Sequence, residues 1–370
     1  MDEQVIFSLL RLGLGTSKDI QNENISDLFL ATEDQWLQLE EMARFHGVSG
    51  VVLDGIQAII DELGPECLGR SFTPEKWKMY ILHWIGEVQQ GYEAGNMQQM
   101  VVVNDIQHRW GEAGIRMMLM KGLATGTYYP DPKHHCPGDI DCYLFDDYAK
   151  GNEIAKEWAD KVDEGWYKHS VISYKGQTIE NHQFFVHTRE GKKSKQLNEA
   201  LCDTLKDAHY ETLSGTSVLL PPPMFNALFL TYHAQAHFLE EGLRLKQLLD
   251  WAMFLRRDAS KVDWQVFYMI CEKYHLLRFA VIATDIAVHY LGVNIENPEI
   301  VTDSPFTAKV IHSTLYDKDY VFSSGKSGWA NRWHIVKNLF KYRWKYHDIY
   351  QHSVIWQLWW YAAGFLFKGE

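Results

Sequence analysis

The stretch GDIDCYLF, residues 138–145, decides the fold. A short apolar run that carries two aspartates is typical of a strand with one buried face, because successive side chains of a strand point to opposite faces. The apolar side chains of this run then share the buried face, and Asp139 and Asp141 share the other. The stretch therefore predicts a strand that presents two neighbouring carboxylates outside a hydrophobic core.

The segments on either side extend this strand into a sheet. Upstream, the apolar run 115–120 predicts a buried strand that ends in a tight turn at Lys121 and Gly122. Downstream, we expect a helix over 148–162 and then a hairpin over 167–187 that turns at Lys175-Gly176. This alternation of strands and helices indicates an α/β module.

Helical patterns flank the module on both sides. Thr32 and Gln35 have the spacing of a capping box, and Pro221-Pro222-Pro223 suits the start of a later helix. Further helices are expected over 245–255 and 264–291. The expected fold class is α+β, with a small mixed sheet between two helical regions. The expected domains are residues 1–90 (N-terminal helical region), 91–215 (catalytic domain) and 216–370 (C-terminal helical domain).

Composition limits the classes of partner. The 370 residues carry a formal net charge of −12, whereas domains that bind bulk nucleic acid are usually basic. The five cysteines contain no CxxC pair, and the odd count fits reduced thiols. The acidic start does not resemble a signal peptide, and the apolar run 354–367 is shorter than the roughly 20 residues that cross a bilayer. We expect a cytoplasmic protein without a membrane segment.

Two aspartates on one face of a strand suggest a cation site. Their carboxylates repel each other, and a bound Mg²⁺ would relieve the repulsion through the hard oxygen ligands that it prefers. The alternative is that Asp139 and Asp141 simply end an exposed strand in water.

Residues on either side favour the cation site. Gly122 lets the backbone approach a phosphate closely, and Lys121 offers a positive charge beside it. Glu180 and His182 share one face of the later strand, so Glu180 is a candidate third acid. The alternative for Glu180 is an ordinary surface residue of the hairpin.

Together these motifs resemble the DNA polymerase β-like nucleotidyltransferase superfamily, and within it a family of uncharacterised bacterial nucleotidyltransferases. The resemblance rests on the Lys-Gly turn, Tyr129-Pro130, the Gly-Asp-Ile-Asp strand and the later acid-x-His. It extends over roughly residues 30–290. A helical block supports it through four further positions: His233, His237, Arg244 and Asp250.

The resemblance implies a Mg²⁺-dependent enzyme with a polymerase β-like module. It would use two ions, with Mn²⁺ as an alternative, to move a nucleoside monophosphate from a nucleoside triphosphate (NTP) to a hydroxyl of a small acceptor. The implied catalytic residues and metal ligands are Asp139, Asp141 and Glu180. The implied nucleotide-binding residues are Lys121, Gly122, His135, His182 and Arg244.

One position departs from the family pattern. His135 stands where the family usually has an arginine, and histidine cannot make the two-pronged contact with phosphate that arginine makes. His134 could share that role, or both histidines could be plain loop residues. The departure permits one alternative, a degenerate relative that binds a nucleotide or a partner without turnover. A further alternative is a toxin–antitoxin component of the same fold.

Two other patterns favour packing over chemistry. His233 and His237 stand one helical turn apart without a third ligand at metal spacing, so we expect a packed pair. Basic and aromatic residues alternate over 333–346, which fits nucleic-acid stacking or an amphipathic helix. Because the chain is acidic, we expect packing or a partner surface here.

Overall fold

The computed structural model describes residues 3–188, 191–297, 299–317, 328–351 and 353. The apolar run 354–367 lies outside the described residues. None of the helices in the described part combines the length and the apolar character that a membrane crossing requires.

The centre of the fold is a mixed sheet with seven strands in the described residues, in the order β3-β4-β5-β2-β1-β7-β6. The strands are β1 Met118–Met120, β2 Ile140–Tyr143, β3 Lys161–Asp163, β4 His169–Tyr174, β5 Gln177–His182, β6 His209–Leu213 and β7 Thr216–Leu220. Strand β2 pairs antiparallel with β1 and parallel with β5, and β4 and β5 form the predicted hairpin. The α+β class with a mixed sheet is confirmed, and the sheet continues through β7, past residue 215.

One face of the sheet packs against helices α6 (Ala94–Glu112) and α8 (Tyr148–Ala155). Ile140, Cys142 and Leu144 are buried in the hydrophobic cluster that joins these elements. Asp141 points to the opposite face, because neighbouring side chains of a strand alternate. The two faces predicted for residues 138–145 are therefore confirmed.

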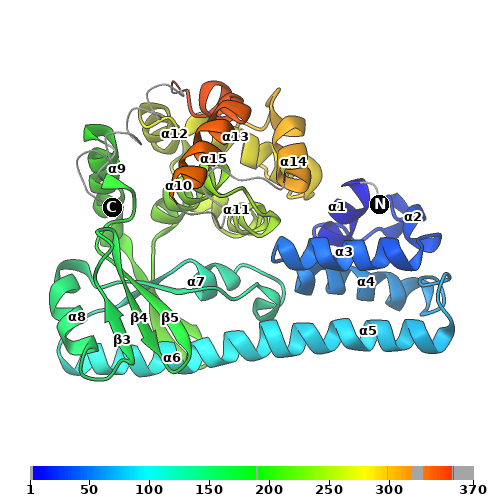
Figure 1. Ribbon diagram of the computed structural model, residues 1–370, viewed down its shortest axis with the longest axis horizontal. Helices are drawn as coiled ribbons and strands as arrows, with labels where there is room; N and C mark the ends of the chain where they lie inside the picture. The colour runs from blue at the N-terminus through cyan, green and yellow to red at the C-terminus, as the bar shows by residue number, and fades with distance from the viewer. Residues whose placement is uncertain (1–2, 189–190, 298, 318–327, 352, 354–370) are drawn as a thin grey trace.

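The N-terminal helices lie at the opposite end of one long helix from strands β3–β5 (Figure 1). They are α1 Glu3–Gly13, α2 Ser26–Phe29, α3 Glu33–Phe45 and α4 Ser49–Leu63. The predicted capping box of Thr32 and Gln35 is present at the start of α3. Helix α5 (Pro74–Val88) continues through a π-helical turn at Gln89–Glu93 into α6. The predicted boundary at residue 90 thus falls inside a continuous helix.

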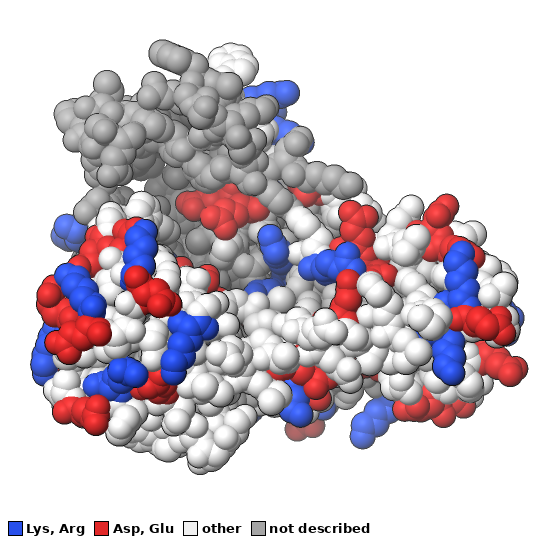
Figure 2. Space-filling model, turned by 60° about the horizontal axis from the view of Figure 1, so that its bottom comes forward, with Lys and Arg blue, Asp and Glu red and all other residues white. Residues whose placement is uncertain are grey.

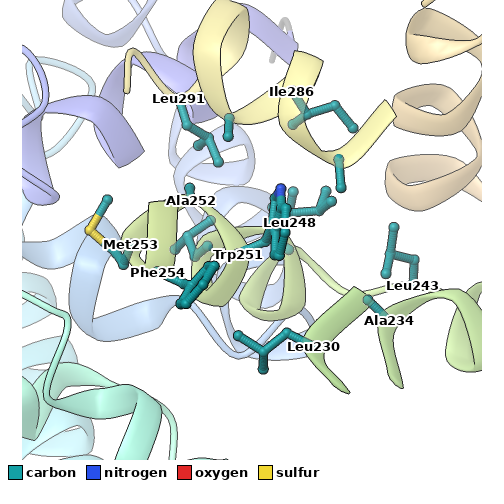
Figure 3. Close-up of a cluster of buried hydrophobic side chains, with 14 of the residues drawn as sticks. Leu230, Ala234, Leu243, Leu248, Trp251, Ala252, Met253, Phe254, Ile286 and Leu291 are labelled. Atoms are coloured by element: carbon teal, nitrogen blue, oxygen red, sulfur yellow. The ribbon is translucent and has the colours of Figure 1, made fainter. Parts of the chain in front are cut away.

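The later helices are α7 Gly122–Gly126, α9 Lys192–Asp203, α10 Pro223–Glu240, α11 Leu245–Asp258, α12 Trp264–Lys273, α13 Leu277–Asp285, α14 Thr307–Tyr316 and α15 Gly328–Lys341. Apolar side chains of the C-terminal helices join those of α1–α4 in one hydrophobic cluster. Figure 3 shows part of it, with Leu248 and Trp251 of α11 below Ile286 and Leu291. The two helical regions therefore share a core.

Two predicted helices are shorter than expected. The helix predicted over 148–162 ends at Ala155, because the chain turns and residues 161–163 pair with β4 instead. The helix predicted over 264–291 is divided where His275 adopts a φ of 61°. Bonds from the His275 and Leu276 amides to the carbonyls of Glu272 and Cys271 complete a Schellman motif at the end of α12.

The predicted packing of residues 333–346 is found at the end of α10. Lys345 Nζ donates to the carbonyl oxygen of Phe238 at 3.2 Å, and Tyr346 Oη donates to that of Leu239 at 3.0 Å. These carbonyls belong to the last turn of α10, which has no intrahelical donors for them. Basic and aromatic residues of this segment thus cap a helix.

Candidate active site

A cavity of about 650 Å³ lies between the carboxylate-bearing face of the sheet and helices α10 and α11. Most of the residues predicted for the site line it: Lys121, Gly122, His135, Asp139, Asp141, Glu180 and Arg244. His182 is beside them but almost fully buried. The fold therefore gathers side chains that are more than one hundred positions apart in the sequence.

The three predicted catalytic carboxylates lie on one face of neighbouring strands. Asp141 and Glu180 are direct partners in the parallel pairing of β2 with β5. Asp139 precedes β2 and, two residues before Asp141, shares its face. Burial raises the pKa of Asp139, and the charges of Glu180 and Asp141 raise it further. The three carboxylates thus form a negatively charged cluster, which a bound cation would stabilise.

Lys121 supplies a positive charge at the floor of the cavity. Its Nζ atom lies 2.8 Å from Asp141 Oδ1. Burial disfavours its charged form, but the charges of Asp141 and Glu180 outweigh burial and raise the Lys121 pKa. Burial likewise opposes the Asp141 carboxylate, yet Lys121 and His182 hold the pKa of Asp141 well below its usual range. Both groups are charged near pH 7.

The turn after β1 is conformationally unusual. Lys121 has a φ of 44°, which is uncommon for a residue other than glycine and is typical of functional sites. Gly122 follows with a φ of 41°, and a Cβ atom there would lie 3.4 Å from the carbonyl oxygen of Asp139. The turn therefore brings its backbone close to the strand that carries the aspartates.

His182, which the sequence predicts to bind the nucleotide, contacts the carboxylates of Asp141 and Glu180. Its Nε2 atom is 2.8 Å from Asp141 Oδ1 and 3.4 Å from Glu180 Oε2. Its Nδ1 atom is 3.3 Å from the carbonyl oxygen of Phe184. The imidazole is thus held between a backbone carbonyl and two carboxylates.

His169 belongs to this cluster but is not among the residues predicted from the sequence. This residue lies directly opposite His182 in the β4–β5 pairing, and its Nε2 atom is 3.5 Å from Glu180 Oε1. Burial lowers the pKa of His169 to about 4, so the imidazole is neutral near pH 7. The sequence does contain a signal for His169. A two-residue turn at Lys175-Gly176 fixes the hairpin register, and that register pairs position 169 with position 182.

His135 lies on the cavity wall in a buried polar contact. Its Nε2 atom is 3.0 Å from Asp250 Oδ1, and Tyr129 Oη donates to the same oxygen at 2.8 Å. Burial opposes the charged form of Asp250, but these two contacts lower its pKa below the usual value. His135 therefore connects the loop before β2 to helix α11.

The other side of this loop, residues 133–138, is held by N-terminal elements. Asn96 of α6 donates to two carbonyl oxygens of the loop, at 2.9 and 2.8 Å. His134 Nδ1 lies 2.8 Å from Asp54 Oδ2 of α4, and the hydrogen bond to Asp54 raises the pKa of His134. The loop is thus fixed between helices of both flanking regions.

Further cations line the cavity at Lys168, Arg244 and Lys246. Burial and the charge of Lys121 lower the pKa of Lys168. Arg244 is exposed, with its guanidinium 5.1 Å from the ring centre of Phe45. A cavity that combines carboxylates with several cations suits a ligand that carries both metal ions and phosphates.

His233 and His237 also line the cavity and contact each other. Their rings pack edge to face, with centroids 4.5 Å apart, as the packed-pair interpretation expects. His237 Nδ1 is 3.1 Å from Glu241 Oε2. On the face in Figure 2, basic and acidic side chains are interspersed, without a broad basic field among the described residues.

The comparison with protein families gives one match. A family model described as an uncharacterised nucleotidyltransferase matches residues 32–292, which is more than half of the chain and includes every residue of the cavity described above. No curated protein and no solved structure matches the chain.

Proposed function

The chain belongs to the uncharacterised nucleotidyltransferase family, and on that premise we propose that it moves a nucleoside monophosphate from an NTP to a hydroxyl group of a small molecule. The observation that carries the proposal is the meeting of Asp139, Asp141 and Glu180 beside Lys121 in one cavity. The resemblance of the motifs supports a polymerase β-like module as part of the same proposal.

The donor set fits Mg²⁺, with Mn²⁺ as an alternative. Asp139, Asp141 and Glu180 would hold the cations through carboxylate oxygens, which are the ligands that Mg²⁺ prefers. The raised pKa of Asp139 supports this fit, since burial and repulsion from Glu180 and Asp141 cause it and a bound cation would oppose both effects. When bound, the cations would neutralise phosphate charge and make the acceptor hydroxyl more acidic.

The side chains of this chain then have distinct tasks. Lys121 donates to an oxygen of the triphosphate, and Arg244 and Lys246 bind its outer phosphates. The acceptor oxygen attacks the α-phosphorus, a P–O bond forms, and the bond to pyrophosphate breaks. Glu180 accepts the hydroxyl proton, and pyrophosphate leaves with the electron pair of the broken bond.

A small acceptor is favoured over a polynucleotide. The cavity, about 650 Å³, has the size of a small-molecule site and must hold the nucleotide as well. The net charge of −12 and the mixed charges in Figure 2 oppose binding of a polyanion. The proposal therefore includes one NTP and one small hydroxyl compound as substrates.

The test is pyrophosphate release from labelled NTPs in the presence of Mg²⁺ and a library of hydroxyl metabolites. We expect release with a subset of acceptors, and a loss of roughly 100-fold or more in Glu180→Gln. Glu199→Gln is the matched control, because Glu199 is an exposed acid on α9. Equal rates in Glu180→Gln and the wild type would contradict the role given to this carboxylate.

A further inference from the structure

Two imidazoles and one carboxylate form a cluster beside the aspartates. His169, Glu180 and His182 each offer one ligand atom, and these atoms lie within 4.8 Å of one another. His169 and His182 are direct partners of β4 and β5, and Glu180 precedes His182 by two residues on the same face. The positions are therefore set by the sheet, which holds ligands more precisely than a loop does.

Both imidazoles turn the same nitrogen toward the carboxylate. The Nε2 atoms of His169 and His182 are 3.5 and 3.4 Å from the two oxygens of Glu180. Nδ1 of His182 faces the carbonyl oxygen of Phe184, which can only accept a hydrogen bond. When Nδ1 donates to this carbonyl, Nε2 can direct its lone pair at a metal ion; without an ion, a proton on Nε2 can be donated to Asp141 Oδ1, 2.8 Å away.

A metal ion among these three ligand atoms, which lie within 4.8 Å of one another, would offset the charges of the neighbouring carboxylates. A lone pair that faces the carboxylates of Glu180 and Asp141 is repelled unless a proton or a metal ion separates them. Histidines that bind metals usually donate their second nitrogen to a backbone carbonyl or a carboxylate, as His182 does. The geometry of His182 is thus compatible with that of a metal ligand.

We propose that His169, Glu180 and His182 bind one divalent transition-metal ion, beside the Mg²⁺ proposed for Asp139 and Asp141 and with Glu180 shared between the two positions. Imidazole nitrogen favours ions such as Zn²⁺, whereas Mg²⁺ favours oxygen ligands. Three protein ligands leave coordination positions open for water or a substrate oxygen. The part of this inference that concerns catalysis rests on the proposed function, because the ion would then be the second of two unlike cations.

A second cluster among the described residues meets the same distance limit, but its acids already pair with a cation. It contains the buried Glu40 of α3 and the exposed His83 and Glu87 of α5. Arg44 already pairs with both acids, at 2.9 and 2.7 Å. We infer no site there, and His83→Ala removes it as a source of background binding.

The experiment is calorimetric titration of the untagged His83→Ala protein with Zn²⁺ and, separately, with Mg²⁺, without nucleotide. We expect one Zn²⁺ per chain with higher affinity than Mg²⁺, and a loss of roughly 100-fold or more in Zn²⁺ affinity when His169→Ala is added. The matched control is His237→Ala, a cavity histidine outside the cluster, which keeps Zn²⁺ binding. His169→Gln replaces His169→Ala if circular dichroism shows that the alanine variant is unfolded.

A spectroscopic readout identifies the ligands directly. Pulsed electron paramagnetic resonance of Cu²⁺, bound in place of Zn²⁺, should show couplings to imidazole nitrogen that weaken in the His169 variant and persist in His237→Ala. Zn²⁺ binding no tighter than Mg²⁺ binding, or equal binding by the two histidine variants, would overturn the inference. Because no NTP is present, these outcomes are separate from a failure of pyrophosphate release, which would overturn only the proposed function.

Discussion

Asp141 lies directly opposite Glu180 across the parallel strands β2 and β5. Side chains in such positions are neighbours, and like charges placed there destabilise a sheet. Lys121 compensates part of this cost, since its ammonium is 2.8 Å from Asp141. The sheet thus keeps a repulsive pair together at the place where a cation and a phosphate chain would bind.

The first prediction concerns this counter-charge. Lys121→Met removes the buried partner of Asp141, so we expect the free energy of unfolding to fall by about 3 kcal/mol. Mg²⁺ or Mn²⁺ should restore more stability to this variant than to the wild type, because a bound cation replaces the lost charge. Thermal and urea unfolding with and without the metal ions measure both effects.

Lys168→Met is the contrasting variant for that experiment. Lys168 lines the same cavity, but burial and the charge of Lys121 lower its pKa, so its charge is a cost in the folded protein. We expect no loss of stability on its removal. If both methionine variants lose the same stability, the specific pairing of Lys121 with Asp141 is not what stabilises the cavity.

The second prediction concerns the contact between the active-site loop and α11. Asp250→Ala leaves His135 and Tyr129 without their shared acceptor, which should cost about 2 kcal/mol. Hydrogen exchange should accelerate in the loop 133–138 while the β6–β7 hairpin stays protected. Uniform acceleration across the chain would instead indicate global destabilisation without a local role for Asp250.

The third prediction is a pH dependence at Asp105 on α6. Its carboxylate accepts from Arg109 Nε, Tyr174 Oη and Lys175 Nζ, at 3.0, 2.7 and 2.6 Å. Burial opposes the charged form, but these partners lower the Asp105 pKa from 3.8 to about 2. A lowered carboxyl pKa gives stability that is complete above about pH 4 and is lost as the pH falls toward 2.

Asp105→Asn tests this dependence. We expect the variant to be less stable than the wild type by roughly 1 to 2 kcal/mol at pH 7, with a difference that shrinks below pH 4. Urea unfolding at a series of pH values measures it, and Asp160→Asn is the control, since Asp160 is exposed and without an ion pair among the described residues. A difference that stays constant down to pH 3 contradicts the charge-based explanation.

The centre of the fold could be predicted from sequence because its signals are local. Alternation in residues 138–145 gave the two faces of β2, and the Lys175-Gly176 turn gave the hairpin. The same turn also determines that His169 faces His182, which the sequence analysis did not use. The position of His169 in the site could therefore have been predicted from the hairpin register that this turn determines.

Other features depend on contacts that no local pattern reveals. The helix after β2 ends at Ala155 because residues 161–163 find a partner in β4, and this strand pairing overrides local helix preference. The break between α12 and α13 occurs at His275, where neither glycine nor proline marks it. The role of His135 depends on Asp250, which lies 115 positions away in the chain.

The measurement that tests the central claim most directly is nucleotide binding in the presence and absence of Mg²⁺, by calorimetry, in the wild type and in Asp139→Asn/Asp141→Asn. It needs no knowledge of the acceptor. We predict Mg²⁺-dependent NTP binding by the wild type and its loss in the double variant, with unchanged circular dichroism. NTP binding that is equal in both proteins, or that does not depend on Mg²⁺, would contradict the claim.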